Sequence, residues 1–259
     1  MIDLLSYDKI VINSSGGKDS VSAIYSTVQM AISQNYNIDN IIISHQDLKI
    51  CEWPGTLDLV KKQATFFGIR NVVINSRDES ILDYALRRGK WPSSKQRWCT
   101  SDFKRAVGDK VITALTRELE GNLKILHVFG FRADESSARS KKQVFVRNER
   151  LSTRKRIVDD YLPIHGWSVF NVWECIHGNN IPYHYAYDLG MPRLSCAYCI
   201  LAPFDALVLS GIHNKELLIK YVEVERIIDH KFRMDFSLED VLNAVNNGYV
   251  PKKINNWKM

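Results

Sequence analysis

The sequence predicts an α/β protein with a doubly wound, mainly parallel sheet, followed by a helical, cysteine-containing C-terminal part. Two observations indicate this fold class. Over the first half of the chain, short apolar runs alternate with stretches of helical periodicity, which is the pattern of repeated β-α units. The run Ile41-Ile42-Ile43 lacks polar alternation, as expected for a strand that is covered on both faces.

A glycine pair separates the first predicted strand, Ile10–Ile12, from a predicted helix over Asp19–Ala31. Glycine permits positive φ, so successive backbone N–H groups can point into one concavity at the positive end of the new helix. Serine hydroxyls and Lys18 add donors and a positive charge. The turn is therefore predicted to bind phosphate. A Walker A loop is excluded, because Ile12 and Asp19 stand where that motif needs glycine and Ser or Thr.

The remaining elements continue the alternation as far as residue 129. Strands are expected at residues 38–45, 72–74 and 123–129, and helices at residues 55–67, 80–88 and 101–118. Beyond Arg139 the sequence shows no clear strand. We divide the chain into a core (1–138), a basic substrate loop (139–160) and a helical part with the C-x-x-C pair (161–259).

Ligands of open parallel sheets bind beyond the carboxyl ends of the strands, near the point where the strand order reverses. The glycine-rich turn, the segment His45-Gln46-Asp47 and the segment Gly130-Phe131-Arg132 each follow a predicted strand. We therefore expect these three segments to converge on one site.

The charge of the chain allows a polyanionic partner. There are 35 Lys and Arg against 29 Asp and Glu, and the sequence pI is about 9.0. Residues 139–156 hold eight basic residues and one acid, together with Phe145. Such a segment can follow a phosphate backbone or form a solvated loop. The residues expected to contact nucleic acid are Lys141, Lys142, Arg147, Arg150, Arg154, Lys155, Arg156 and Arg193.

The cysteine content indicates a reducing compartment. There are five cysteines, an odd number, and no charged-then-apolar leader. No apolar run approaches the roughly 18 residues that a membrane helix needs. We expect a cytoplasmic protein without a membrane partner.

Two segments resemble a known superfamily. Ser15-Gly16-Gly17-Lys18-Asp19-Ser20 resembles the SGGxDS loop of the N-type (PP-loop) ATP pyrophosphatases, and residues 130–139 resemble the G-I/F-R-x-x-E-S-x-x-R segment of the PAPS reductase family. The resemblance implies an adenine nucleotide alpha hydrolase-like fold, bound ATP and Mg²⁺, and cleavage of ATP between the α- and β-phosphates. The implied nucleotide contacts are Ser14, Ser15, Gly16, Gly17, Lys18, Asp19, Ser20, His45, Asp47, Gly130 and Arg132. The implied catalytic residues are Lys18, Asp19, Arg132, Arg139 and Lys104. From the residues alone, a structural salt-bridge cluster at residues 130–139 stays an alternative.

Three cysteines also match the family. Residues 98–104 resemble its C-C-x-x-x-K segment, with Thr100 in place of the second cysteine, and residues 194–199 resemble its later C-x-x-C. The three cysteines Cys99, Cys196 and Cys199 can hold a [4Fe-4S] cluster, bind zinc with a histidine, or remain plain or redox-active thiols.

The combination of loop, cysteines and basic segment most resembles the DNA phosphorothioation branch of the family. The implied activity is adenylation of an acceptor, expected to be a DNA backbone phosphate, for insertion of sulfur from a cysteine desulfurase or another donor. The alternatives are an adenylyl or phosphoadenylyl sulfate reductase, a tRNA thiolation enzyme and a non-catalytic nucleotide-binding component; a homodimer is left open. Reduction is weakly supported, because assimilatory reductases end in an E-C-G-I-H segment. Here Glu174-Cys175-Ile176-His177 lacks the glycine, and the last six residues contain no cysteine.

Overall fold

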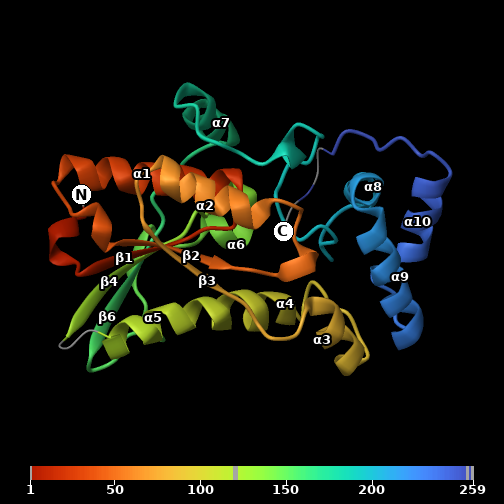
Figure 1. Ribbon diagram of the computed structural model, residues 1–259, viewed down its shortest axis with the longest axis horizontal. Coiled ribbons are helices and arrows are strands. Elements are labelled where there is room, and N and C mark those ends of the chain that lie inside the picture. The colour runs from red at the N-terminus through yellow and green to blue at the C-terminus, as the bar shows by residue number, and fades with distance from the viewer. Residues whose placement is uncertain (1, 119–121, 255–256, 258–259) are drawn as a thin grey trace. The chain divides into compact units, whose positions relative to one another are not determined.

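The computed structural model describes residues 2–118, 122–254 and 257 of the chain. Its six strands form one sheet in the order β3-β2-β1-β4-β6-β5 (Figure 1). All neighbouring strands are parallel except β5, which pairs antiparallel with β6. The predicted α/β fold with a mainly parallel sheet is confirmed. The strands are β1 (Lys9–Asn13), β2 (Ile41–Gln46), β3 (Asn71–Asn75), β4 (Leu123–Val128), β5 (Phe145–Arg147) and β6 (Arg156–Tyr161).

Helices cover both faces of the sheet, as Figure 1 shows. On one face, α1 (Lys18–Ser33) and α2 (Thr56–Phe66) share an apolar core with Ile10 and its neighbours on that side. On the other face, α5 (Ala106–Glu118) packs against a core that contains Val11. Successive strand residues point to opposite faces, so strands covered on both sides need unbroken apolar runs.

The strand order reverses at β1. Strand β2 lies on one side of β1 and β4 on the other, with Ile12 opposite both Ile43 and Val128. The chain leaves β1 at Asn13 and enters the predicted phosphate-binding turn directly. The sequence thus places this turn at the switch point, where open α/β sheets bind ligands.

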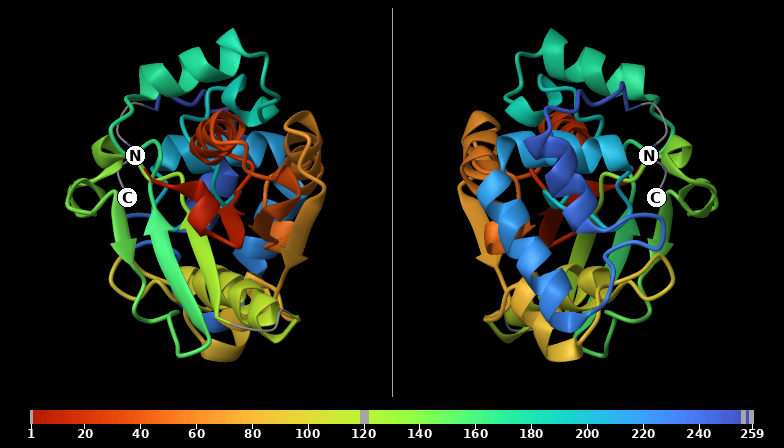
Figure 2. Two further views of the ribbon diagram at one scale, coloured as in Figure 1. Left: turned by 90° about the vertical axis from the view of Figure 1, so that its left-hand side faces the viewer. Right: turned by 90° about the vertical axis from the view of Figure 1, so that its right-hand side faces the viewer.

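Strands β5 and β6 correct the expectation that no strand follows Arg139. They form one edge of the sheet, drawn in green in Figure 2. Asp159 and Asp160 interrupt the apolar pattern of β6, so the sequence of this segment does not indicate a strand. Asp159 accepts hydrogen bonds from the Tyr7 hydroxyl (2.8 Å) and from Arg147 (2.6 Å), so distant partners compensate its burial.

The described chain divides into two compact units that interleave along the sequence. The sheet unit contains residues 2–46, 55–75 and 106–184, including α6 (Ser137–Ser140) and α7 (Val169–Gly178). The helical unit contains residues 47–54, 76–105 and 185–259. Its helices are α3 (Ile81–Arg88), α4 (Trp98–Thr100), α8 (Phe204–His213), α9 (Lys215–Ile228) and α10 (Leu238–Asn246). No helix within the described ranges is long and apolar enough to cross a membrane.

An aromatic core holds the helical unit together. The rings of Trp91 and Tyr221 stack with centroids 5.5 Å apart, and Phe232 meets Trp91 edge-on at 5.1 Å. Trp53 is buried in the same cluster. A short π-helical turn, Ser101–Arg105, precedes α5, so the helix expected from residue 101 begins regular α geometry only at Ala106.

Candidate functional site

The residue 14–20 loop, which joins β1 to α1 and includes the first turn of that helix, opens the positive end of the helix to a ligand. Gly16 has φ +71°, which a residue with a Cβ adopts only with strain. Gly17 is the N-cap of α1, and no side chain caps the helix there. The Ser20 hydroxyl donates to the Gly17 carbonyl at 2.8 Å and fixes the turn. An anion can therefore satisfy the helix amides, as at other phosphate sites on helix N-termini.

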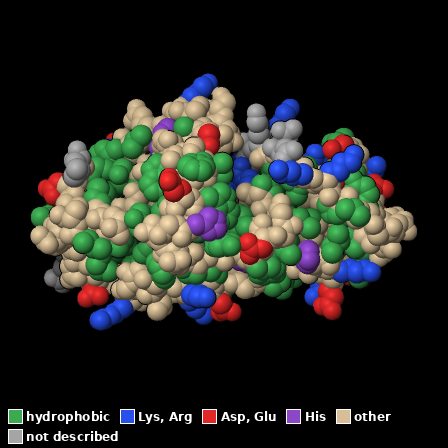
Figure 3. Space-filling model, turned by 90° about the horizontal axis from the view of Figure 1, so that it is seen from above, with side chains coloured by type: hydrophobic (Ala, Val, Ile, Leu, Met, Phe, Trp, Pro, Cys, Tyr) green, Lys and Arg blue, Asp and Glu red, His purple; other side chains and the backbone are tan. Residues whose placement is uncertain are grey.

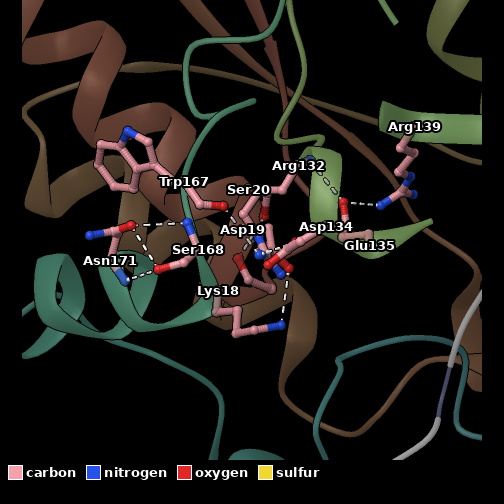
Figure 4. A network of polar contacts seen from close by, with 11 residues as sticks. Lys18, Asp19, Ser20, Arg132, Asp134, Glu135, Arg139, Trp167, Ser168 and Asn171 are labelled. Atoms are coloured by element: carbon pink, nitrogen blue, oxygen red, sulfur yellow. Dashed lines mark hydrogen bonds and ion pairs between the residues drawn. The ribbon is translucent and has the colours of Figure 1, made fainter. Parts of the chain in front are cut away.

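Asp19 lies between two cations in the first turn of α1. Its Oδ1 accepts a hydrogen bond from Arg132 Nε at 2.6 Å, and its Oδ2 from Lys18 Nζ at 3.1 Å (Figure 4). Both cationic side chains are almost completely buried. Burial alone would raise the pKa of the Asp19 carboxyl, but the charges of Lys18 and Arg132 hold that pKa below its usual range. The carboxylate therefore stays ionised at neutral pH.

The segment after β4 reaches this network because Gly130 has no side chain. A Cβ built on Gly130 would lie 2.6 Å from the Asp19 carbonyl oxygen and 2.9 Å from Ser20 Cα. This contact brings the backbone of residue 130 directly onto the first turn of α1. The turn after β1 and the segment after β4 therefore converge, as the sequence predicted.

Two further acids, Asp134 and Glu135, hold the arginines of the segment after β4 in place. Glu135 accepts a hydrogen bond from the backbone N–H of Arg132 at 2.9 Å and pairs with Arg139. Arg132 also pairs with Asp134 (Figure 4). The Arg139 guanidinium lies 4.5 Å from the centroid of the Phe131 ring. The salt-bridge cluster that was one alternative from sequence is therefore present, and phosphate binding by the same residues stays a prediction.

The geometry gives Asp19 a positioning task. Each of its carboxylate oxygens accepts from one cation, so the group holds Lys18 and Arg132 in place. Mg²⁺ in nucleotide sites keeps several waters and binds through substrate phosphates and one or two carboxylates. The predicted magnesium ion stays a prediction, for which ATP phosphates, waters and the Asp19 carboxylate can supply the ligands.

Two buried side chains brace the loop from neighbouring elements. His45, at the end of β2, contacts the Ser14 carbonyl through Nδ1 at 2.9 Å. Gln63 of α2 donates to the carbonyls of Gly16 (3.3 Å) and Pro182 (2.9 Å). The bond of His45 is to the protein backbone, so its predicted nucleotide contact stays a prediction. Gln63 was missed, although a fully buried glutamine on an apolar helix face is a signal that a partner exists.

A buried relay also fixes the residue that precedes the loop. Asn13 Nδ2 lies 2.7 Å from His127 Nε2 and 3.2 Å from the Val128 carbonyl. His127 Nδ1 lies 3.2 Å from an oxygen of Asp160, whose two oxygens also accept from Asn148 at 3.0 Å. Because the Asn13 amide donates, His127 Nε2 accepts and its Nδ1–H donates to Asp160. Sequence analysis overlooked this relay, since His127 stands in a strand that otherwise reads as apolar.

Replacing His127 by Ala should loosen the loop through Asn13. The change leaves Asn13 and Asp160 without their shared partner, and the free energy of unfolding should fall by about 1–3 kcal/mol. Urea denaturation measures this loss. Its effect on the loop should appear as weaker ATP binding by calorimetry, at a temperature where the variant is still folded. ATP affinity equal to that of the wild type would show that the relay does not position the loop.

The helical unit brings the three predicted cysteines together around Lys104. Cys99 and Cys199 interact electrostatically with each other and with Cys196, and all three are only partly exposed. Burial raises the pKa of the Cys99 and Cys196 thiols, while Cys196 raises the pKa of Lys104. A metal would therefore displace protons from these thiols on binding. The predicted catalytic role of Lys104 stays a prediction, as do the roles of Asp47 and Arg193 in the same unit.

The basic residues of the predicted nucleic-acid segment fall into two groups. Arg147 pairs with Asp159, Arg150 pairs with Asp109, and Arg156 donates to the Leu151 carbonyl at 2.6 Å. These guanidinium groups hold the edge of the sheet together. Within the described residues, no acid pairs with the second group, and that group carries the prediction of nucleic-acid contact. It consists of Lys141, Lys142, Arg154 and Lys155.

The chain is similar to a known domain family and to several known proteins. The domain profile described as "Phosphoadenosine phosphosulfate reductase domain" matches residues 9–202. An uncharacterized protein, MJ0973, of Methanocaldococcus jannaschii is 28% identical over 216 residues, covering 81% of this chain and 46% of the relative. An adenosine 5'-phosphosulfate reductase of Oceanobacillus iheyensis is 26% identical over 170 residues, covering 65% and 63%. The chain thus spans less than two thirds of either relative.

A solved structure supports the fold. The FMN adenylyltransferase of Candida glabrata in complex with ATP superposes with a TM-score of 0.50 at 12% identity, over 74% of this chain and 55% of that one. At this identity the likeness concerns the fold alone.

Proposed function

The chain belongs to the phosphoadenosine phosphosulfate reductase domain family, and from this premise we propose that it is an ATP pyrophosphatase that adenylates an acceptor. One observation carries the proposal: Asp19 holds Lys18 and Arg132 against the uncapped N-terminus of α1. Two fixed cations and a helix terminus suit a leaving pyrophosphate, whose negative charge grows as the α–β bond breaks.

In the proposed reaction an acceptor oxygen attacks the α-phosphorus of ATP. The bond between that phosphorus and the oxygen bridging to the β-phosphate breaks, and pyrophosphate leaves with the bonding electrons. The residue 14–20 loop binds the departing group through backbone amides, while Lys18 and Arg132 neutralise its charge. The acceptor now carries AMP, which is a better leaving group than oxide.

We propose that the acceptor is a backbone phosphate of DNA. The support is the exposed basic stretch Lys141–Arg147, which belongs to the sheet unit that carries the loop. On the face seen in Figure 3, positive and negative side chains are interspersed. The terminal sulfur of a persulfide from a desulfurase would then attack the acceptor phosphorus, and the bond from that phosphorus to the AMP oxygen would break and release AMP. A thiol would next cleave the S–S bond, leaving sulfur on phosphorus and forming a disulfide with the donor.

The test is to follow ATP labelled on the α-phosphate with DNA, with tRNA and without acceptor. Release of pyrophosphate that depends on DNA supports activation of the DNA backbone. Release that depends on tRNA would instead support a tRNA thiolation enzyme. ATP binding without pyrophosphate release in any mixture would contradict the proposal and favour a nucleotide-binding component.

Removing two exposed cations should weaken DNA binding and its salt dependence. For single strands, each lost phosphate contact reduces the magnitude of the negative slope of the logarithm of the binding constant against the logarithm of the salt concentration by about 0.7. Replacing Lys141 and Lys142 by Ala should therefore reduce the slope by about 1.4 if both contact phosphate. Replacing Lys61 and Lys62 on exposed positions of α2 removes the same charge elsewhere and is the control. Equal effects of both pairs would contradict a local contact.

Sulfur transfer can involve the cysteine cluster of the helical unit. Cys99, Cys196 and Cys199 would hold an iron–sulfur cluster, and three thiol donors beside a cationic Lys104 suit its negative charge. When bound by only three cysteines, such a cluster supplies an open iron position to which sulfur can attach. Zinc and plain thiols remain the alternatives. Iron and acid-labile sulfide that are lost in a Cys196→Ser variant would support the cluster, and their absence after anaerobic purification would contradict it.

A second candidate function is reduction of an adenylyl sulfate, which the relatives named adenosine 5'-phosphosulfate reductase favour. Cys175 in Glu174–His177 is an unsuitable nucleophile for it. This cysteine is buried within α7 beside Val21 and Val172, and burial raises the pKa of its thiol. Thiol-dependent release of sulfite from adenylyl sulfate, without turnover of ATP, would establish the reductase instead.

A further inference from the structure

A groove of about 560 Å³ lies at the edge of the sheet unit. Three aromatic residues line it, Tyr7, Phe145 and Tyr161, together with Val144 and Lys124. Asp3 is the one acid in the lining. The residue 14–20 loop contributes nothing to the groove, and the proposed adenylation step does not use it.

The groove exists because the edge strand carries apolar side chains that the described chain leaves exposed. Val144 and Phe145 expose 47% and 43% of their surface. Among the described residues, strand β5 pairs only with β6, so no described strand lies along its outer side (Figure 2). Exposed aromatic and aliphatic groups that border one hollow indicate a binding surface.

The positive charge of the lysines around the groove indicates what kind of partner can bind there. Lys124 Nζ stands 4.4 Å from the centroid of the Tyr7 ring, inside the groove. Lys141 and Lys142 are exposed just before Val144, and no acid among the described residues pairs with them. A second copy of the chain would bring these like charges together. Cations that flank exposed aromatic rings are instead the usual combination for binding single-stranded nucleic acid.

The groove runs along the edge of the sheet unit, from Tyr7 and Lys124 near the amino ends of β1 and β4 to Phe145 and Tyr161, and only this second end lies level with the nucleotide loop. Phe145 is paired with Tyr161, Tyr161 with Val128, and Val128 with Ile12, in one row across the strands. Ile12 lies two residues before the loop, with Asn13 between them. Phe145 and Ile12 are three strand spacings apart, which corresponds to about 14 Å across the sheet. A strand of nucleic acid that reaches the loop can therefore also pass Phe145.

We propose that this groove binds a base of single-stranded nucleic acid by stacking it on Phe145, beside Tyr161. The inference rests on the proposed function for its link to the acceptor, and it adds that the acceptor is unpaired where it meets the protein. In a duplex the faces of the bases are covered by stacking, whereas a single strand can turn one base into a groove.

The experiment compares binding of fluorescein-labelled oligo(dT) and of a duplex of the same length, by anisotropy without ATP. Phe145→Ala should weaken single-strand binding about 5- to 150-fold, the range for loss of one stacked base. Duplex binding should change little. The control is Phe170→Ala, which removes a 70% exposed phenylalanine from α7 and should leave both affinities unchanged. Phe145→Leu keeps an apolar side chain, and its smaller loss separates stacking from folding defects.

Equal effects of Phe145→Ala and Phe170→Ala on single strands would overturn the proposal, and so would duplex binding at least as tight as single-strand binding. Failure of the wild type to bind either oligonucleotide would also overturn it, and would favour a peptide strand added to β5. Because ATP is absent, these outcomes are independent of pyrophosphate release. A protein that stacks single strands but never releases pyrophosphate would contradict the proposed function and leave the groove assignment standing.

Discussion

Replacing Arg132 by Ala is expected to lower the rate of pyrophosphate release by about 10²–10³-fold, the usual cost of removing one group that stabilises transition-state charge. Arg132 is buried, and its Nε donates to Asp19 Oδ1 at 2.6 Å. Its loss therefore removes one of the two cations that stabilise the leaving pyrophosphate, and it leaves Asp19 Oδ1 without this hydrogen bond. Single-turnover kinetics with labelled ATP measures the effect.

Two further variants separate charge from folding in this prediction. Arg132→Lys keeps the positive charge but not the planar fork, and should recover part of the rate. Arg226→Ala removes an arginine from an exposed ion pair with Glu239 and should leave the rate unchanged. Pyrophosphate release by Arg132→Ala at the wild-type rate, in a folded protein, would remove Arg132 from the reaction.

Replacing Gly130 by Ala is expected to separate the segment after β4 from the first turn of α1. The added methyl group would lie 2.6 Å from the Asp19 carbonyl oxygen, and backbone atoms on both sides must move to admit it. Overpacking of this kind costs about 1–3 kcal/mol of stability. The displacement should also break the Arg132–Asp19 contact, so activity should fall more than stability predicts. Thermal denaturation and the turnover assay measure the two effects.

The control for Gly130 is Gly166→Ala. A Cβ at Gly166 meets no atom within 4 Å, so the same chemical change should be nearly neutral there. If both variants keep full stability and full turnover, the close approach of residue 130 to α1 is not needed for the site.

The central part of the site could be predicted from the sequence because its signals are local. The glycine pair with Lys18 and Asp19 marks the loop, and Arg132 follows a recognisable strand. That both belong to one edge follows from the topology of parallel sheets. The three cysteines could likewise be found by their spacing, and the structure brings them together in one unit.

Other contributions depend on pairings between distant parts of the chain, which no local pattern reveals. Strand β6 carries Asp159 and Asp160 because Tyr7, Arg147 and Asn148 satisfy them, and these partners lie elsewhere in the sequence. His127 looked like an isolated polar residue in a strand for the same reason. The basic segment could be recognised by composition, but only the structure shows which of its cations already have acidic partners.

The most direct test of cleavage between the α- and β-phosphates is to identify the products formed from ATP and Mg²⁺ in the presence of single-stranded DNA. The wild type should release pyrophosphate and transfer AMP to the acceptor, and an Asp19→Ala variant, in which Lys18 and Arg132 lose their shared anchor, should release neither. Release of ADP and orthophosphate would place the cleavage at the β–γ bond and contradict the assignment of the loop.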